Sequence, residues 1–381
     1  MKIGNIDNMK LYKKIMKNGL LSIILLVAAV SYGQSLEQKN SENFTVQKGT
    51  NIAHWLSQSG RRGEERERFF TKEDIKTIAA MGFDHIRLPI DEEQMWNNQV
   101  ERHEDAFQLM DNCIKWCEEY NLKVIVDLHI LRSHHFNAKE KPLWTDAREQ
   151  EKFFDLWRDL SKALSKYPNS LVAYELMNEA VADDHESWNK LLKNAFAAIR
   201  ELEPERTIVI GSNRWQSVET FDELKVPEND KNILLSFHFY TPFLLSHYNA
   251  SWTNLKDYKG PVNYPGILLT EKEFNALPEN VKPSVKQYVN VKFDKEVLLE
   301  LWQKPIQKAK SLGLPLYCGE FGIIEKAPKK EALAWYEDMM ALFEETGIGH
   351  ANWNFKSGSF GLVADDGTPN QELIDIITNK K

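Results

Sequence analysis

Short β-rich runs alternate with longer amphipathic runs from residue 49 onward, and this alternation constrains the fold more than any other feature of the chain. Several of the short runs are almost wholly apolar, as in residues 123–128, which is typical of parallel strands covered on both faces. The predicted strands span 49–54, 83–88, 123–129, 171–177, 207–210, 233–239, 315–319 and 349–353. Repeated strand and helix patterns of this kind indicate an α/β protein built around a parallel sheet.

Helical patterns fill most of the intervals between these strands. They span 72–81, 105–120, 147–166, 186–202, 295–312 and 328–346, with a weaker one at 217–226. Thr71 with Asp74 and Asp183 with Glu186 resemble helix N-caps, while Gly82, Gly313 and Gly347 stand where helices should end. Eight strands with helices between them predict a single (β/α)8 TIM barrel over residues 35–381.

One interval is too long for a simple connection. Residues 241–294 follow the sixth predicted strand and are rich in proline and aromatic residues, among them Trp252 and Tyr258. An insertion of this length in a compact domain is usually functional. We find no internal repeat and no linker to a second domain.

Residues 1–34 read as a signal peptide, because lysines precede the apolar run 20–30 and small or polar residues follow it. The run is too short to span a membrane, so we expect an exported protein, periplasmic or extracellular, with no membrane span in its mature form. Removing this segment, which has five Lys and one Asp, changes the formal charge from −8 to −12. Such an acidic chain argues against nucleic acid as a partner. Cys113, Cys117 and Cys318 lack disulfide or metal-site spacing, so we expect them to be buried.

Polar, titratable and aromatic residues follow the predicted strands. In a (β/α)8 barrel the carboxyl ends of the strands surround the site, so residues at these positions are the candidates for chemistry. They are His54, Trp55, Arg87, His129, Asn178, Glu179, Trp215, His238, Tyr240, Glu320 and Trp353.

At these positions the sequence resembles glycoside hydrolase family 5, the cellulase-type barrels of clan A. The resemblance runs in order from about residue 49 to 363. An Asn-Glu pair after the fourth strand and a second Glu at the end of the seventh are its most specific features. The matching segments are Ile86-Arg87-Leu88-Pro89, Asp127-Leu128-His129, Glu175-Leu176-Met177-Asn178-Glu179, His238-Phe239-Tyr240, Gly319-Glu320-Phe321-Gly322 and Trp353.

The resemblance implies a retaining glycosidase that acts on a β-linked polysaccharide, most simply an endo-β-1,4-glucanase. Glu179 would be the acid/base and Glu320 the nucleophile, with the two carboxyls about 5 to 5.5 Å apart. The other implied substrate contacts are Arg87, His129, Asn178, His238, Tyr240, Trp353, Trp55 and Trp215. No cofactor and no metal is expected, and we expect a monomer.

Other interpretations stay open from the sequence. The polymer is not fixed by the fold, so a β-mannanase, an exo-acting β-glucosidase and a β-1,3-glucanase are alternatives. A different class is an inactive carbohydrate-binding barrel. Arg87 is alternatively a buried ion-pair partner of Asp127 or Glu175, while His129 and His238 are alternatively interior histidines.

Overall fold

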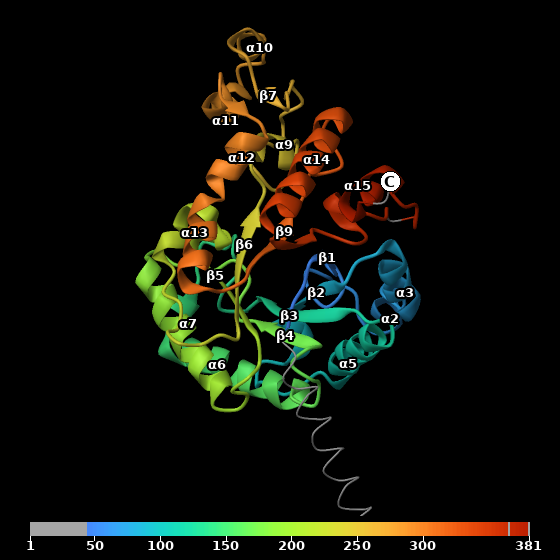
Figure 1. Ribbon diagram of the computed structural model, residues 1–381, viewed down its shortest axis with the longest axis vertical. Coiled ribbons are helices and arrows are strands. Elements are labelled where there is room, and N and C mark those ends of the chain that lie inside the picture. Colours follow the sequence, from blue (N-terminus) through green and yellow to red (C-terminus); the bar gives the residue numbers. More distant parts are fainter. Residues whose placement is uncertain (1–43, 365, 380–381) are drawn as a thin grey trace, which may run out of the picture.

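Eight parallel strands close into one barrel in the computed structural model, which describes residues 44–364 and 366–379 (Figure 1). The strands are β1 (Lys48–Asn51), β2 (His85–Asp91), β3 (Lys123–Ile130), β4 (Val172–Glu175), β5 (Ile208–Gly211), β6 (Ile233–Phe239), β9 (Leu316–Phe321) and β10 (Gly349–Asn352). Around the barrel they pair in the order β1-β10-β9-β6-β5-β4-β3-β2. The eight predicted strands and the predicted (β/α)8 fold are confirmed. The predicted signal peptide lies outside the described residues.

The N-terminal half of the barrel interior is filled by apolar side chains from six neighbouring strands. One buried cluster consists of Ile125, Ala173, Val209, Leu234, Tyr317 and Ala351 together with Phe44 and Val46. Phe44 and Val46 precede β1, so they close the N-terminal end of the barrel. The polar strand-end residues are therefore left to the opposite, C-terminal end.

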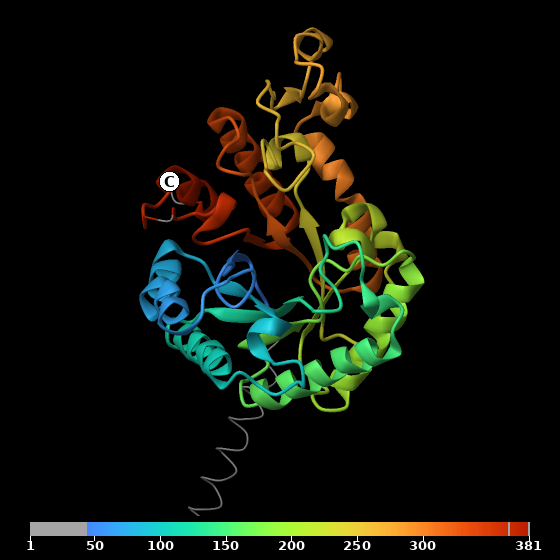
Figure 2. The ribbon, with the colours of Figure 1, turned by 180° about the vertical axis from the view of Figure 1, so that it is seen from behind.

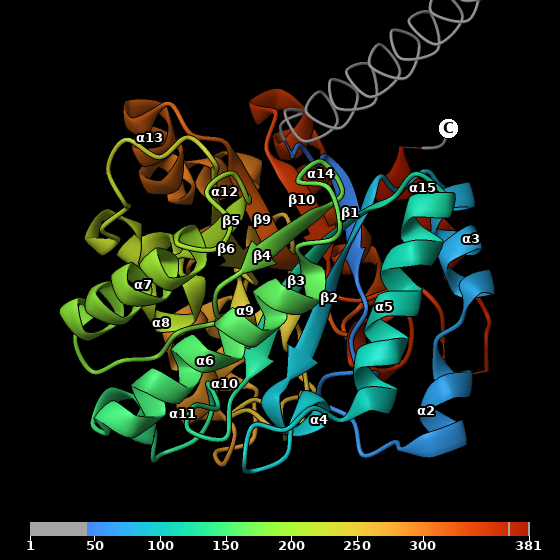
Figure 3. The same ribbon diagram turned by 90° about the horizontal axis from the view of Figure 1, so that it is seen from below.

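Helices surround the barrel and cover the outer faces of its strands (Figure 3). They are α2 (Gly63–Phe69), α3 (Lys72–Met81), α4 (Glu92–Met95), α5 (Glu104–Glu119), α6 (Ala147–Leu164), α7 (His185–Arg200), α8 (Asn213–Gln216), α12 (Lys295–Leu301), α13 (Gln303–Leu312), α14 (Lys329–Thr346) and α15 (Gln371–Thr378). The predicted capping box of Thr71 and Asp74 is present at α3, and Gly82, Gly313 and Gly347 are left-handed C-caps.

Three details of the helix prediction are wrong. The cap of α7 is Asp184, whose carboxylate accepts a hydrogen bond from the Ser187 N–H at 2.8 Å, and not Asp183. The predicted helix 295–312 is divided at Trp302, because Pro305 has no N–H to donate and fits only the first turn of a new helix. In place of the weak helix 217–226 the chain forms only the short 3₁₀ helix Val218–Glu223.

The insertion 241–294 rises from the C-terminal end of the barrel, beside α12 and α14 (Figures 1 and 2). It holds α9 (Phe243–Ser246), β7 (Gly266–Ile267), α10 (Glu271–Asn275), α11 (Lys282–Val285) and β8 (Lys292–Phe293), with β7 and β8 paired as an antiparallel sheet. Tyr258 and Leu268 are fully buried within it, and the Tyr264 hydroxyl donates to Asp338 of α14 at 2.7 Å. The insertion is thus an ordered part of the wall above the barrel.

All three cysteines are buried free thiols, as predicted. Cys113 and Cys117 lie in α5, and Cys318 lies in β9. Among the described residues, no helix has both the length and the apolar character that crossing a membrane requires.

Candidate active site

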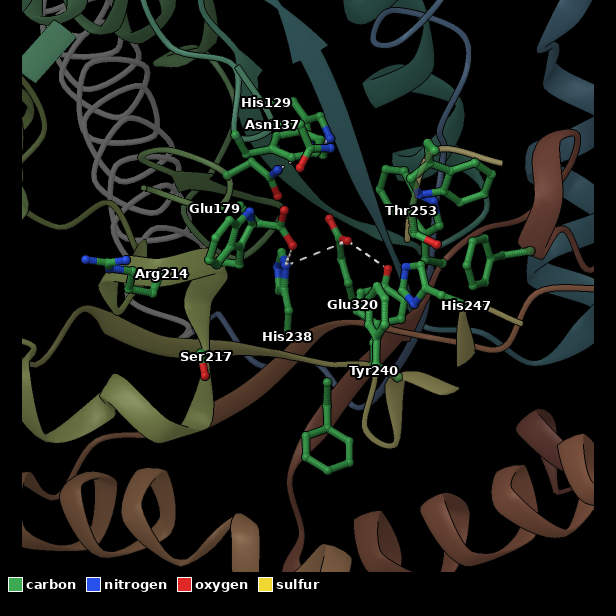
Figure 4. Close-up of a pocket in the computed structure, with 18 of the residues that line it drawn as sticks. His129, Asn137, Glu179, Arg214, Ser217, His238, Tyr240, His247, Thr253 and Glu320 are labelled. Carbon is green, nitrogen blue, oxygen red and sulfur yellow. Dashed lines mark hydrogen bonds and ion pairs between the residues drawn. The ribbon is translucent and has the colours of Figure 1, made fainter. Parts of the chain in front are cut away.

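A pocket of about 1230 Å³ opens at the C-terminal ends of the strands. Its lining includes Glu179, which follows β4, and Glu320, which lies in β9. One carboxylate oxygen of each residue and a ring nitrogen of His238 all lie within 4.8 Å of one another. Figure 4 shows the three side chains converging, with dashed lines joining the His238 ring to both carboxyl groups. The barrel therefore brings together two carboxyls that are 141 residues apart in the sequence.

Glu320 is held by two donors. The Arg87 Nη1 donates to Glu320 Oε1 at 2.7 Å, and the Tyr240 hydroxyl donates to Glu320 Oε2 at 2.9 Å. Glu179 has a different neighbour, since the His238 Nδ1 lies 3.0 Å from its Oε1. The His238 Nδ1 lies farther from Glu320 Oε2, at 3.6 Å.

These environments separate the protonation states of the two carboxyls. Burial raises the pKa of Glu179 well above its usual range, and the negative charge of Glu320 raises it further. Burial also raises the pKa of Glu320, while the Arg87 guanidinium acts in the opposite direction. We assign the proton to Glu179, because Glu320 alone accepts hydrogen bonds from a cation and a phenol. Burial holds the pKa of His238 well below its usual range, so this ring is neutral.

Arg87 is fully buried beneath the pocket and does not line it. Its Nε and Nη2 donate to Glu175 at 2.6 and 3.1 Å, and Nη2 lies 3.0 Å from Asp127. The structure therefore places Arg87 against the nucleophile candidate Glu320 and not on the pocket surface. Its position matches the ion-pair alternative, with Glu320 as an additional partner.

His129 and Trp353 form one side of the pocket as a stacked pair. Their ring centroids are 5.4 Å apart and the planes differ by 10°. The His129 Nδ1 lies 2.7 Å from Asp127 Oδ2, and burial lowers the pKa of His129 to about 3, so the ring is neutral and Nδ1 carries the hydrogen. Asn178 lines the pocket beside them, with its Oδ1 accepting from Arg87 at 2.9 Å.

The other two predicted tryptophans have opposite outcomes. Trp215, 43% exposed, lines the pocket beside Arg214. Trp55 is fully buried, donates its indole N–H to the Arg66 carbonyl at 2.8 Å, and does not line the pocket. The structure therefore places Trp55 away from the pocket surface, and His54, the residue before it, has a left-handed backbone with φ of 61°.

The pocket is completed by Phe243, His247, Trp252 and Phe360 of the connections, and of these the sequence analysis named only Trp252. Phe243 and His247 stack at 4.0 Å, and Trp252 and Phe360 adjoin them. Trp252 is 53% exposed, whereas Tyr258 from the same insertion is fully buried and packs inside it. In Figure 4, Arg214 lies on one side of the carboxyl pair, and His247 and Thr253 lie on the other. No period or motif marks these positions, since they lie on very short helices and irregular connections.

The geometry can be compared with known proteins. Residues 38–359 match the family model described as Cellulase (glycosyl hydrolase family 5). Endoglucanase C of Acetivibrio thermocellus is 36% identical over 348 residues, covering 87% of this chain and 98% of that protein. Cellodextrinase A of Ruminococcus flavefaciens is 30% identical over 304 residues, covering 79% and 83% of the two chains.

Solved structures share the fold. Thermotoga maritima Cel5A in complex with mannotriose superposes with a TM-score of 0.71 at 23% identity, covering 89% of this chain and 99% of that one. The family model spans most of the chain, and the identity to Endoglucanase C extends over nearly the whole of that relative. This chain therefore belongs to glycosyl hydrolase family 5.

Proposed function

We propose that this protein is an endo-β-1,4-glucanase that hydrolyses its substrate with retention, Glu320 acting as nucleophile and Glu179 as acid/base. The observation that carries the proposal is the pair of buried carboxyls within 4.8 Å of one another, one bound by Arg87 and Tyr240 and the other beside a neutral His238. A separation this short leaves no room for a water between the carboxyls, as inversion would need.

The reaction proceeds in two displacements. Glu320 attacks the anomeric carbon while Glu179 gives its proton to the leaving glycosidic oxygen, forming a glycosyl-enzyme ester. Glu179, now ionised, removes a proton from water, which attacks the anomeric carbon and releases Glu320. Asn178 binds the sugar 2-hydroxyl, and Trp353 supports the ring as it flattens toward the transition state. His129, His238 and Tyr240 orient the substrate and the two carboxyls.

Endo action follows from the shape of the pocket. Lining residues extend past the carboxyl pair in both directions, toward Arg214 on one side and toward His247 and Thr253 on the other (Figure 4). A chain that continues on both sides of the cleaved bond therefore finds surface to bind. The name Endoglucanase C, carried by a relative of nearly equal length, supports this substrate class.

Export and monomeric action are also part of the proposal. The lysines and the apolar run of residues 1–34 have the pattern of a secretory signal, which supports export. Export also suits a polymer substrate, which the enzyme would meet outside the cytoplasm.

The test combines a substrate panel with two variants. The protein is incubated with cellulose derivatives, lichenan, glucomannan, xyloglucan and laminarin, and the products are sized. We expect mixed cello-oligosaccharides early in the reaction. Mannan products, laminarin products or only single sugars would instead support the mannanase, β-1,3-glucanase or exo-glucosidase alternative. Absence of any cleavage would support an inactive binding barrel.

The roles of the two carboxyls are separated by leaving group. Glu320→Ala should abolish turnover of every substrate. Glu179→Ala should abolish turnover of polysaccharide but retain cleavage of aryl glycosides whose leaving groups need no proton. Azide should rescue Glu179→Ala with a β-configured product. The same product from Glu320→Ala alone would reverse the assignment.

A further inference from the structure

Three consecutive residues other than glycine adopt left-handed conformations directly after β5. Arg214, Trp215 and Gln216 have φ values of 62°, 63° and 52°. Single left-handed residues of this kind are uncommon, and they persist only where surrounding contacts hold them. The turn 214–216 is therefore a feature that the neighbouring structure maintains, and its partners show what it does.

Its partner is the segment that carries Glu179. The Trp215 N–H donates to the Ala180 carbonyl at 3.2 Å. The Asn213 carboxamide binds both backbone groups of Ala182, accepting from its N–H at 2.8 Å and donating to its carbonyl at 3.1 Å. The two connections, after β4 and after β5, are joined along their length.

Gln216 makes the contact that reaches Glu179 itself. The buried Gln216 Oε1 accepts from the Glu179 backbone N–H at 2.9 Å. Its Nε2 donates to Glu175 Oε1 at 3.1 Å and to Ser236 Oγ at 3.2 Å. A carboxylate only accepts hydrogen bonds, so the amide nitrogen has to face Glu175 and the oxygen has to face Glu179.

Glu179 needs such a support because its own backbone is left-handed, with φ of 44°. The direction of its carboxyl toward His238 depends on that conformation, since the backbone fixes where the side chain starts. Without Gln216 the buried N–H of Glu179 loses its acceptor, and relaxing the backbone would turn the carboxyl away.

Gly211, the last residue of β5, leaves the space that the Gln216 side chain occupies. A Cβ added to Gly211 would lie 2.4 Å from the Gln216 Cγ, so only glycine fits at the end of β5. The Ser217 backbone also forms a parallel bridge with His238, which joins the turn to β6, the strand that carries the side-chain partner of Glu179.

We propose that Gln216, presented by the left-handed turn 214–216, is a positioning residue that fixes the direction of the Glu179 carboxyl for proton transfer to the leaving group. This inference rests on the proposed acid/base role of Glu179. It adds a link from the proton donor to the buried Arg87 and Glu175 pair through one carboxamide.

The test uses Gln216→Met, which has a similar length but no polar atom, and compares aryl cellobiosides with good and poor leaving groups. We expect kcat/KM to fall about tenfold or more for phenyl cellobioside and for polymer, because the misdirected acid no longer transfers its proton well. For dinitrophenyl cellobioside, which needs no proton, we expect a change of less than about threefold. An equal loss on both aryl substrates would overturn the proposal.

The matched control is Asn189→Leu. Asn189 is a buried carboxamide that also joins two backbone groups, accepting from the Lys225 N–H at 3.0 Å and donating to the Glu223 carbonyl at 2.9 Å, outside the pocket. Its loss should change thermal stability without making activity depend on the leaving group. If both variants show the same leaving-group dependence, Gln216 has no special role.

Gln216→Glu keeps the test valid if Gln216→Met does not fold. The new side chain retains an oxygen for the Glu179 N–H, but it can donate to Glu175 only when protonated. The ratio of phenyl to dinitrophenyl activity should then rise toward the wild-type ratio as the pH falls. A ratio that follows the wild-type profile at every pH would contradict the proposal.

Glu179→Ala, measured in parallel, distinguishes a failure of the acid/base role of Glu179 from a failure of the positioning role of Gln216. If Glu179→Ala shows no leaving-group dependence, the proposed function fails together with the role of Gln216. If Glu179→Ala shows it and Gln216→Met does not, only the positioning role is wrong.

Discussion

The Arg87 Nη1 lies 2.7 Å from the Glu320 Oε1, although the guanidinium itself is fully buried beneath the pocket. Burial lowers the pKa of Arg87, but Asp127, Glu175 and Glu320 together raise it well above its usual range, so the cation persists. One buried charge therefore serves three carboxylates. Its planar array of donors is what makes this possible.

Arg87→Lys should impair the nucleophile while keeping the positive charge. A single ammonium group cannot replace the bonds made by Nε, Nη1 and Nη2, so the pKa of Glu320 should rise. The acidic limb of the pH profile of kcat/KM should move to higher pH, and stability should fall by about 3 kcal/mol or more. Arg200→Lys is the control, because Arg200 pairs with Asp230 outside the pocket. An acidic limb unchanged in Arg87→Lys would contradict this role.

Trp353→Ala should lower kcat/KM by about tenfold or more on short and long substrates alike. Stacking on an indole is worth about 1 to 2 kcal/mol, and about 1.4 kcal/mol corresponds to a factor of ten. Trp353 is only 8% exposed and its ring is stacked on His129, so the loss also frees that ring. Kinetics with an aryl cellobioside and with polymer, alongside circular dichroism, measure the effect.

Trp252→Ala should behave differently, because Trp252 lies in the insertion, at the edge of the pocket. We expect a higher KM for long chains and no change for a short aryl glycoside. Equal effects of the two tryptophan substitutions on both kinds of substrate would mean that neither residue has its assigned subsite.

Asp91→Asn should stabilise the protein at neutral pH. Burial raises the pKa of Asp91 to about 7, from about 4 in an unfolded chain. Unfolding between these values releases a proton, so the wild-type protein loses stability as the pH rises from about 4 to 7. Asparagine keeps an acceptor for the Gln58 N–H, which Asp91 binds at 2.7 Å, without the charge. Urea unfolding at pH 4.5 and 8 should show the advantage of Asp91→Asn growing by roughly 1 to 4 kcal/mol.

The control for this pH dependence is Asp159→Asn. Burial raises the pKa of Asp159, but its bonds to Arg102 and Trp96 lower the pKa below the usual value overall. Its ionised form therefore contributes stability above the unfolded pKa, and this contribution is lost as the pH falls. Asp159→Asn should destabilise most at neutral pH, the opposite sign. Parallel curves for Asp91→Asn and wild type would refute the assignment.

Activity should survive exhaustive chelation. Glu179, His238 and Glu320 are close enough to hold a cation, but Glu320 is already bound by Arg87, and the two carboxyls suffice for the proposed chemistry. The measurement is the initial rate after dialysis against EDTA, with and without added divalent ions. A complete loss that one cation restores would refute the metal-free mechanism.

The parts of the site on the strands were predictable because the strands themselves were. Glu179, Glu320 and Tyr240 follow apolar runs at the carboxyl ends of parallel strands, where barrel geometry brings distant residues together. Trp55 shows the limit of this reasoning, because it also follows a predicted strand but is fully buried and does not line the pocket.

The loop-borne parts were not predictable in the same way. Phe243, His247 and Phe360 meet only after two long connections have folded against one another. The contact of Gln216 with Glu179 depends on a left-handed turn of residues that are not glycine, which no local sequence preference indicates. Tertiary contacts determine both the aromatic cluster of the loops and the conformation of the turn.

The burial of Cys113, Cys117 and Cys318 has a practical consequence for spectroscopy. The sequence has three cysteines, and all three are among the residues that the structure describes. A thiol-reactive dye added to the native protein therefore meets no exposed cysteine. Ser251→Cys in the insertion and Gln108→Cys in α5, both at exposed positions, would therefore accept a donor and an acceptor fluorophore against an unlabelled background. Energy transfer between them then reports, in real time, whether the insertion moves relative to the barrel while a glucan chain is being cut.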